Sequence, residues 1–450
     1  MVSPFCGETS AKSMNERLEK YVNDLSLLIN IPTVSDAEVP DAEAFASFRS
    51  KLRELFPNVF RAFRCEEFHG AILLSLPAEG GDPVLFMSHH DVVSENGTWV
   101  HEPFRATLED GKLYGRGTLD TKGNLWAILT AIEELLGEGY SFGRPVYIES
   151  SCNEETTGQG AYEISRELKK RGVRFSFTMD EGGMIVYDPI GGADGYFAMV
   201  ATGEKDCIDL VFTARSNGGH ASTPDKNNPL SRLSRFIVDV EKHSLFKPKL
   251  DDVTVETLGK LSRKTKGALK FVFRNAGCFR HLLARVMTKF SPTANSMVRT
   301  TLCFTKAKGS DAYNVIPTEA YVTGNMRLSP HDDKAEVLKK LGKIAEKYGI
   351  EITEHDPGYP TEVCDHNSPA FRMLEETVSE CFPGVITAPY LSTGASDTKY
   401  FSDLTENAFR FAPFTVTDEQ LDAMHAKDEN IDISTLIPAV DFYKKLMRKL

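Results

Sequence analysis

The 450-residue sequence lacks the features typical of membrane-spanning, secreted and nucleic-acid-binding proteins. No apolar run approaches the roughly 20 residues that a membrane-spanning helix needs, and the N-terminus turns polar before a secretory signal could form. Basic residues are in deficit: 52 Lys and Arg stand against 64 Asp and Glu, a formal net charge of −12 that argues against a nucleic-acid partner. We therefore expect a soluble cytoplasmic protein that neither spans a membrane nor binds nucleic acid.

Paired cysteines are also missing. The eight cysteines are scattered singly and none forms a CxxC motif, so neither a thiolate zinc site nor a dithiol redox motif is indicated. The spacing fits reduced thiols in the cytoplasm, and a disulfide or two stays open as an alternative. Hydrophobic residues make up 41% and charged residues 26%, an ordinary globular composition, and the length predicts two domains.

Three short apolar runs, 83–87, 146–148 and 175–179, have the continuous hydrophobicity of buried strands. Between the first two, Leu125 begins a series of apolar residues that share one helical face, and Gly137 can end that helix. Strands that alternate with helices predict an α/β fold, with a mixed, largely parallel sheet flanked by helices.

The pattern changes after about Gly203. Apolar and polar residues alternate over 208–213, as in a half-exposed strand. The elements expected next are a helix from Pro229, strands near 300–306 and 320–326, a helix capped by Asp333 and Glu336 and ended by Gly349, and a strand from Glu351. This order predicts an α+β open-faced sandwich. We expect residues 203–357 to form an inserted lid domain, and residues 1–202 and 358–450 to form the larger domain.

Several metal-capable side chains fall at the carboxyl ends of the predicted parallel strands or in nearby loops. The set is His89, Asp120, Glu154, Glu155, Asp180 and, much later in the chain, His425. Open α/β sheets gather active-site groups at this edge. Two histidines and three of these carboxylates are already too many for one tetrahedral zinc, and they suit two zinc ions that share a carboxylate. For any single member the alternative is a structural role, and Glu154–Glu155 alone is commonly a solvated pair at a helix start.

The sequence runs around these residues carry a family resemblance. They are 88–93 (SHHDVV), 115–123 (GRGTLDTKG), 153–155 (NEE), 180–182 (DEG), 218–222 (GGHAS), 314–317 (NVIP) and Arg327. In this order, and over most of the chain, they resemble the signature runs of metallopeptidase family 20, which includes aminoacylases, carboxypeptidases and dipeptidases. Thr121 and Ser94 depart from the common pattern, but neither is an expected ligand.

The resemblance implies a metal centre with two ions. His89 and Asp180 would hold one zinc ion, Glu155 and His425 would hold the other, and Asp120 would bridge them. Cobalt or manganese could take the place of zinc, because N/O sites bind these metals similarly.

The resemblance also implies catalytic roles. Glu154 would be the general base, which takes a proton from the attacking water and returns it to the departing amine. Asp91 would fix the orientation of His89. His220, on the lid, would stabilise the oxyanion. In relatives the matching histidine reaches the site of a partner subunit, so a homodimer is expected.

Substrate-binding residues follow from the same resemblance. Arg327 would bind the carboxylate of the substrate, a task that suits its planar guanidinium group. Asn314, Gly394 and Ser396 would complete the same pocket. The alternatives are a surface charge at Arg327 and a plain loop at 394–397.

Residues 246–295 form an extra segment between the first helix and the second strand of the lid, in which apolar and basic residues are interleaved. The run 292–301 resembles the corresponding run in the carboxypeptidase S and N-acyl amino acid hydrolase branch. We expect an amphipathic helix whose apolar face packs on the lid. The alternatives are a wall for a long acyl chain and a contact with a membrane surface.

The expected function is hydrolysis of an amide bond beside a free carboxylate, in a small peptide or an N-acyl amino acid. Two alternatives are kept. One is deacylation of a small acetylated or succinylated diamino acid, against which the long insertion argues. The other is a catalytically silent binding protein of the same fold.

Overall fold

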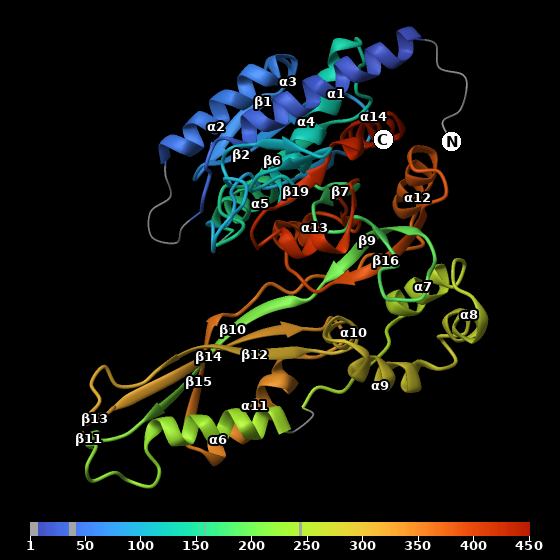
Figure 1. Ribbon diagram of the computed structural model, residues 1–450. Helices are drawn as coiled ribbons and strands as arrows, with labels where there is room; N and C mark the ends of the chain where they lie inside the picture. The colour runs from blue at the N-terminus through green and yellow to red at the C-terminus, as the bar shows by residue number, and fades with distance from the viewer. Residues whose placement is uncertain (1–7, 36–41, 157, 243–244) are drawn as a thin grey trace.

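The computed structural model describes residues 8–35, 42–156, 158–242 and 245–450. Figure 1 shows a larger α/β part, in which both ends of the described chain lie, and an elongated lid beside it. The chain enters the lid where β9 (Tyr196–Glu204) runs directly into β10 (Asp206–Arg215), and it finally leaves the lid after β15 (Ile350–Asp356). Between these two connections the chain also leaves the lid and returns to it, because a helical segment in the middle of the insertion packs on the larger part.

A ten-stranded sheet forms the centre of the larger part, in the order β1-β2-β6-β3-β7-β17-β9-β8-β18, with β16 paired to β9. Its other strands are β1 (Arg64–Phe68), β2 (Ala71–Leu76), β3 (Val84–Met87), β6 (Val146–Ser150), β7 (Phe177–Asp180), β8 (Ile185–Tyr187), β16 (Ile386–Ser392), β17 (Ala408–Arg410) and β18 (Thr415–Val416). The central strands β6, β3, β7 and β17 are parallel, whereas β1 and β2 are antiparallel. The predicted mixed, largely parallel sheet is confirmed, and the three apolar runs are β3, β6 and β7.

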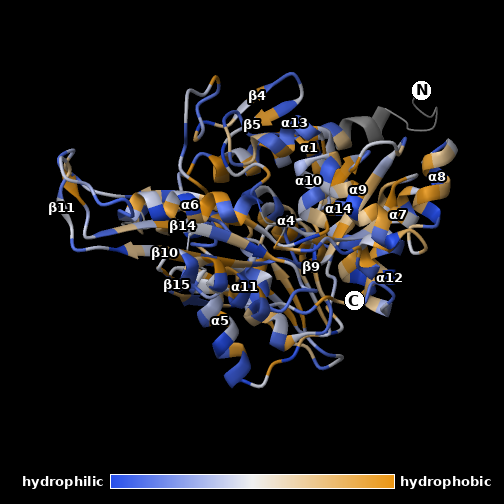
Figure 2. Ribbon diagram, turned by 90° about the horizontal axis from the view of Figure 1, so that it is seen from below, coloured by the Kyte–Doolittle hydropathy of each residue, from blue (hydrophilic) through white to orange (hydrophobic). Residues whose placement is uncertain are grey.

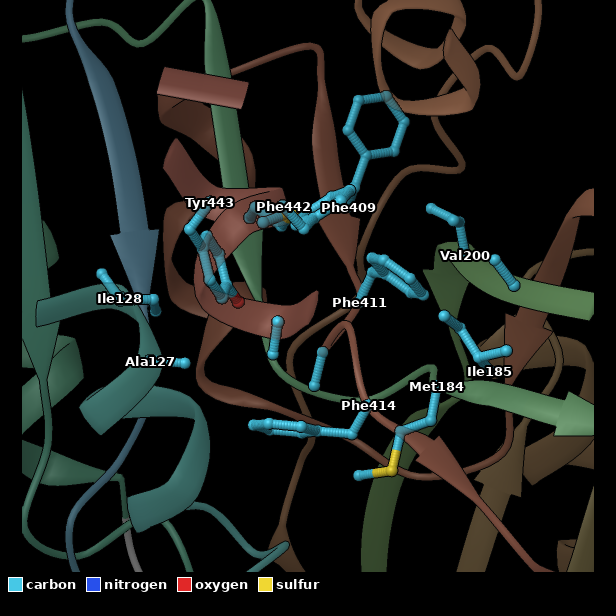
Figure 3. Packing of buried hydrophobic residues seen from close by; sticks show 14 of the residues in the cluster. Ala127, Ile128, Met184, Ile185, Val200, Phe409, Phe411, Phe414, Phe442 and Tyr443 are labelled. Carbon is cyan, nitrogen blue, oxygen red and sulfur yellow. The ribbon is translucent and has the colours of Figure 1, made fainter. Parts of the chain in front are cut away.

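Helices bury both faces of this sheet. On β2, Ile72 and Leu74 belong to the main core, whereas Ala71 and Leu73 belong to a second core on the opposite face. The main core is built with α1 (Glu8–Ile29), α2 (Ala42–Leu55), α3 (Pro57–Ala62), α4 (Lys122–Gly137), α12 (Pro369–Cys381) and α14 (Leu436–Lys449), and the second with α5 (Gln159–Lys170) and the 3-10 helix η1 (Asp397–Leu404). Figure 3 shows Phe442 of α14 beside Phe409 and Phe411, and Ala127 and Ile128 of α4 on the side of Tyr443.

The lid is a four-stranded antiparallel sheet in the order β12-β14-β10-β15, with β12 (Thr301–Lys308) and β14 (Glu319–Leu328). Helices α6 (Pro229–Lys242) and α11 (Lys334–Lys347) cover one face (Figure 1), and Leu210 and Phe212 are buried in its separate core. The Asp333 side chain accepts a hydrogen bond of 2.8 Å from the Glu336 N–H, as the cap of α11. A small antiparallel sheet of two strands, β11 (Gly219–His220) and β13 (Val315–Ile316), which we call the β11–β13 pair, extends from one end of the lid.

Phe246 packs against the lid core, but the helices of 246–295 do not, so the expectation that this segment packs on the lid was wrong. The segment and its continuation form α7 (Asp252–Leu261), α8 (Gly267–Arg274), α9 (Arg280–Phe290) and α10 (Pro292–Met297). Their buried side chains, which include Leu258, Leu261, Phe273 and Met287, belong to the main core. The Thr257 hydroxyl donates to the carbonyl oxygen of Pro389 on β16 at 2.5 Å, and Lys260 pairs with Glu375 of α12 at 2.6 Å. The reason is that β16 and α12 offer an apolar surface nearby, which the order of elements along the chain does not reveal.

The C-terminal part of the chain returns to the loop that follows β5. Strand β19 (Asn430–Asp432) pairs with β5 (Lys112–Tyr114), which pairs with β4 (Thr107–Glu109). Helix α13 (Asp418–Ala423) precedes β19, and η2 (Ile433–Thr435) leads into α14. None of the described helices is both long and apolar enough to cross a membrane. The seven cysteines that the structure describes are unpaired, and Cys6 lies outside the described residues.

A buried ion pair fixes two loops of this region to each other. Arg116 Nη1 lies 2.9 Å from Glu429 Oε2, and both side chains are almost completely buried. Glu429 also accepts hydrogen bonds of 2.8–3.1 Å from the backbone N–H groups of Gly117, Leu119 and Asp120. Arg116 donates in turn to the carbonyl oxygens of the residues on either side of His425. The pair therefore holds the loop of Asp120 against the loop of His425.

We predict that Glu429→Ala lowers the free energy of unfolding by about 3–5 kcal/mol, because Arg116 would stay buried without its partner charge. Denaturant titration measures this change. Glu102→Ala is the control, since Glu102 pairs with Arg105 on the surface, where an ion pair contributes about 0–1 kcal/mol. A loss for Glu429→Ala no larger than that of the control would contradict the role of the ion pair.

Candidate metal centre

The carboxyl ends of β3, β6 and β7 lie together at one edge of the central sheet, because these strands are adjacent and parallel. His89 follows β3, and Glu154 and Glu155 follow β6. The loop before α4 brings Asp120 to the same edge, and the loop after α13 brings His425. Five of the six side chains that the sequence singled out as metal-capable therefore converge there.

Asp120 lies between two histidines. Its Oδ1 is 3.0 Å from His89 Nε2, and its Oδ2 is 2.8 Å from His425 Nε2. Glu155 Oε2 lies 3.4 Å from the same His425 nitrogen. His89, Asp120 and Glu155 offer ligand atoms that all lie within 4.8 Å of one another. A carboxylate with one oxygen directed to each histidine has the shape needed to bridge two cations.

Glu181, and not Asp180, lies in this cluster. Glu181 Oε1 is 3.7 Å from His89 Nε2, and His89, Glu154 and Glu181 offer ligand atoms within 4.8 Å of one another. Asp180 is directed elsewhere: its Oδ2 accepts hydrogen bonds from the N–H of Thr398 at 3.1 Å and from its hydroxyl at 2.7 Å. In this arrangement Glu181, and not the adjacent Asp180, lies beside His89, because successive residues at a strand end point to opposite sides.

Asp91 is completely buried beneath the cluster. Its Oδ1 lies 3.4 Å from His89 Nδ1, in keeping with the expected orienting contact. The same carboxylate accepts hydrogen bonds from the N–H of Glu154 at 3.2 Å, from the N–H of Glu155 at 3.1 Å and from the hydroxyl of Ser35 at 2.6 Å. Asp91 therefore positions the turn that carries both glutamates as well as the His89 ring.

The electrostatics of the cluster show an excess of negative charge. Burial, together with nearby carboxylates, raises the pKa of Glu154 and that of Glu181 well above their ordinary value. Burial lowers the pKa of His89, but hydrogen bonds to two carboxylates outweigh it and leave the pKa raised. Hydrogen bonds to two carboxylates likewise raise the pKa of His425 to about 10. The cluster favours added positive charge.

The donor set fits divalent metal ions. Imidazole nitrogens and carboxylate oxygens are ligands that zinc, cobalt and manganese accept. Glu155 Oε1 is buried and has no hydrogen-bond partner among the described residues, so this oxygen is available to a cation. Metal ions would also offset the excess negative charge. The residues that could hold them are His89, Asp120, Glu155, Glu181 and His425.

The turn at 394–397 is held by hydrogen bonds to buried residues near the metal-binding cluster. Ser396 is buried, and both its N–H and its hydroxyl donate to Glu204 at 3.1 Å. Glu204 forms a buried ion pair of 3.1 Å with Arg410 at the end of β17. Gly394, by contrast, is exposed. Asp397, next to Ser396, accepts a hydrogen bond from the hydroxyl of Ser151, and burial raises its pKa to about 7. The turn thus anchors the segment that holds Asp180.

The three lid residues singled out in the sequence lie apart from the cluster. Arg327 Nε donates to Asn325 Oδ1 at 3.0 Å, and no hydrogen bond or ion pair joins Arg327 to the cluster within the part of the chain that the structure describes. His220 and Asn314 are exposed at the β11–β13 pair, where the N–H of Ala221 donates to the Asn314 carbonyl oxygen at 2.9 Å. That pair of strands is at the end of the lid farthest from the central sheet (Figures 1 and 2).

Comparison with known proteins identifies related sequences. The chain is 32% identical over 432 residues to the human N-fatty-acyl-amino acid synthase/hydrolase PM20D1, a match that covers 93% of this chain and 86% of the relative. It is 30% identical over 413 residues to the probable carboxypeptidase S-like 2 of Dictyostelium discoideum, covering 90% and 79%. It is 26% identical over 487 residues to carboxypeptidase S of Saccharomyces cerevisiae, covering 95% and 83%.

Solved structures share the fold. The M20 family metallo-carboxypeptidase Sso-CP2 from Sulfolobus solfataricus superposes with a TM-score of 0.70 at 18% identity, over 95% of this chain and 98% of that one. Human carnosine dipeptidase 1 superposes with a TM-score of 0.66 at 16% identity, over 98% and 99%. The model of peptidase family M20/M25/M40 matches residues 85–449, which include every residue of the cluster. The chain therefore belongs to peptidase family M20/M25/M40, and it is a metal-dependent peptidase or amidohydrolase.

Proposed function

We propose that this protein hydrolyses an amide bond next to a free carboxylate, in an N-acyl amino acid or at the C-terminus of a small peptide, with two zinc ions. The observation that carries the proposal is Asp120, whose two oxygens face His89 and His425. The relatives support the same chemistry, since one is called an N-fatty-acyl-amino acid synthase/hydrolase and others carboxypeptidases.

The proposed ligands divide into two groups around Asp120. His89 and Glu181 would hold one ion, His425 and Glu155 would hold the other, and Asp120 would serve both. Glu181 replaces Asp180, the ligand expected from the sequence, because the Asp180 carboxylate is engaged by Thr398. Asp180 and Asp91 then act as positioning residues behind the ligands. Zinc ions bound there would acidify the attacking water and polarise the scissile carbonyl.

Glu154 is the proposed general base. Its carboxyl group lies beside His89 and Glu181, so it can reach a water at the centre, and it is not needed to complete the ligand set. Glu154 removes a proton from the attacking water as the new C–O bond forms. It then delivers that proton to the nitrogen as the C–N bond breaks, which releases an amine and a carboxylate.

The lid supplies the proposed substrate contacts. Arg327 binds the free carboxylate of the substrate. Within the described residues its side chain makes one hydrogen bond, from Nε to Asn325, which leaves the two terminal guanidinium nitrogens open to such a contact. His220 and Asn314 are exposed at the β11–β13 pair, as residues that serve the centre of a second copy would be. A homodimer in the cytoplasm, with His220 stabilising the oxyanion across the subunits, remains part of the proposal.

The buried apolar side chains of 246–295 are taken up by the main core, so only the exposed apolar side chains of this segment are available to contact an acyl chain. A catalytically silent binding protein is not retained, because the proposed base and five metal ligands are all present.

Glu154→Gln should lower kcat by about 10²–10⁴-fold with zinc still bound, because the amide keeps the shape of the side chain but cannot take the proton. Turnover of an N-acyl amino acid and zinc content by elemental analysis are measured on the same sample. Glu163→Gln, on α5 away from the centre, is the control and should keep wild-type turnover. Full activity of Glu154→Gln would remove it as the base.

The choice between Glu181 and Asp180 can be tested by metal content. Glu181→Gln should lose one of the two ions after dialysis, because it removes a ligand. Asp180→Asn should retain both ions with an affinity reduced by about 10–100-fold, the effect typical of a positioning residue. The reverse result, loss of an ion only in Asp180→Asn, would restore the ligand set expected from the sequence.

Arg327→Ala should raise KM for substrates with a free carboxylate by about 10²-fold, since it removes a charge-assisted bidentate contact. The matching substrate amides should be affected little. Arg215→Ala is the control, because Arg215 lies on the lid strand β10 and pairs with Glu319 at the surface. An equal loss on carboxylate and amide substrates would exclude carboxylate recognition by Arg327.

A further inference from the structure

The segment that contains α8 and α9 has a charge opposite to that of the whole protein. Residues 257–310 contain 12 Lys and Arg and no Asp or Glu, in a chain whose formal net charge is −12. Figures 1 and 2 both show α8 and α9 on the side of the molecule opposite the β11–β13 pair. The basic residues of α8 and α9 therefore lie together on one side of the protein.

Helix α9 presents three different stripes. Ala284 and Met287 are buried against the main core. The next stripe, at a spacing of four residues, is apolar and exposed: Leu282 is 62%, Val286 50% and Phe290 69% exposed. The third stripe is basic and exposed and consists of His281, Arg285 and Lys289. An exposed apolar stripe beside a basic one is typical of helices that lie in the interface of a membrane.

Helix α8 extends the apolar surface. Phe271 is 62% exposed, and its ring lies 6.2 Å from that of Phe279, the residue that precedes α9. Lys270 and Arg274 flank Phe271 on the same helix. Two neighbouring helices therefore expose large apolar side chains next to basic ones.

A basic cavity of about 890 Å³ adjoins α9. Among the residues that line it are Lys247, Lys249, Arg285, Lys289, Arg299 and His331, with Asp332 as the acidic residue of the lining. Asp332 accepts a hydrogen bond from Thr300, whereas His331 Nε2 and Arg299 Nε are buried without a hydrogen-bond partner among the described residues. The cavity has the charge and the free donors to receive an anionic headgroup.

We infer that the α8–α9 face docks on an anionic lipid bilayer, with Phe271, Leu282, Val286 and Phe290 inserted among the lipids and the basic residues on the headgroups. The charge of an anionic bilayer is complementary to that of the basic residues on this face. A second copy of the chain would bring two strongly basic faces together, which like-charge repulsion opposes. Nucleic acid would leave the apolar stripe exposed to water. The inference does not depend on the proposed function, because none of these residues belongs to the metal centre.

Vesicle flotation of the full-length protein tests the inference. We expect the protein to float with mixed phosphatidylcholine–phosphatidylserine vesicles and to bind at least about tenfold more weakly to phosphatidylcholine alone, because basic residues near a charged bilayer each add to the affinity. Added salt should weaken the binding. Phe290→Glu should reduce binding to the mixed vesicles by about tenfold or more, since it places a charge in the inserted stripe.

Val238→Glu is the matched control. Val238 is 46% exposed on α6 of the lid, outside the basic segment, so this variant should bind vesicles like the wild type. Circular dichroism checks that both variants are folded, and Leu282→Ser replaces Phe290→Glu if the latter is not. Failure of the folded wild type to float with the mixed vesicles would overturn the inference. So would equal losses in both variants, or a concentration-dependent dimer that Phe290→Glu dissociates in the absence of vesicle binding.

Discussion

The concentration of carboxylates at one edge of the central sheet is the constraint on which the rest of the site depends. Glu154, Glu155 and Glu181 lie near Asp120, and burial makes their charges costly to hold together. Two histidines face Asp120 from opposite sides, yet the pKa values show that negative charge is still in excess. Bound cations would offset the excess negative charge. The same carboxylates that destabilise the site without metal would therefore favour metal binding.

Precision at this site comes from residues that bind no substrate. Asp91 contacts the His89 ring and also accepts hydrogen bonds from the backbone of Glu154 and Glu155. The ion pair of Arg116 and Glu429 holds the Asp120 loop against the His425 loop. The loops come from distant parts of the chain, and buried hydrogen bonds set their relative positions. A metal centre needs this support, because its ligands must hold their geometry to within a fraction of an ångström.

The lid and the helical segment 246–295 carry the residues proposed for substrate binding and for membrane binding, respectively. The lid has its own core and carries Arg327 on β14 and His220 on β11. The buried apolar side chains of residues 246–295 pack in the main core, and a second apolar stripe on α9 is exposed beside basic residues. One segment thus serves the stability of the larger part and also presents a surface whose charge differs from that of the rest of the molecule.

The sequence alone determined the parallel strands, the lid elements and the residues that follow β3 and β6, because hydrophobic periodicity and strand-end position are local properties. Its family resemblance also indicated the family that the comparisons confirmed. Two points depended on tertiary structure. The sequence DEG offers two adjacent carboxylates, and only the direction of each side chain separates Glu181, beside His89, from Asp180, held by Thr398. Likewise, an amphipathic pattern shows that 246–295 buries a face, but the partner surface, β16 and α12, is formed by residues more than a hundred positions later, which only folding brings near.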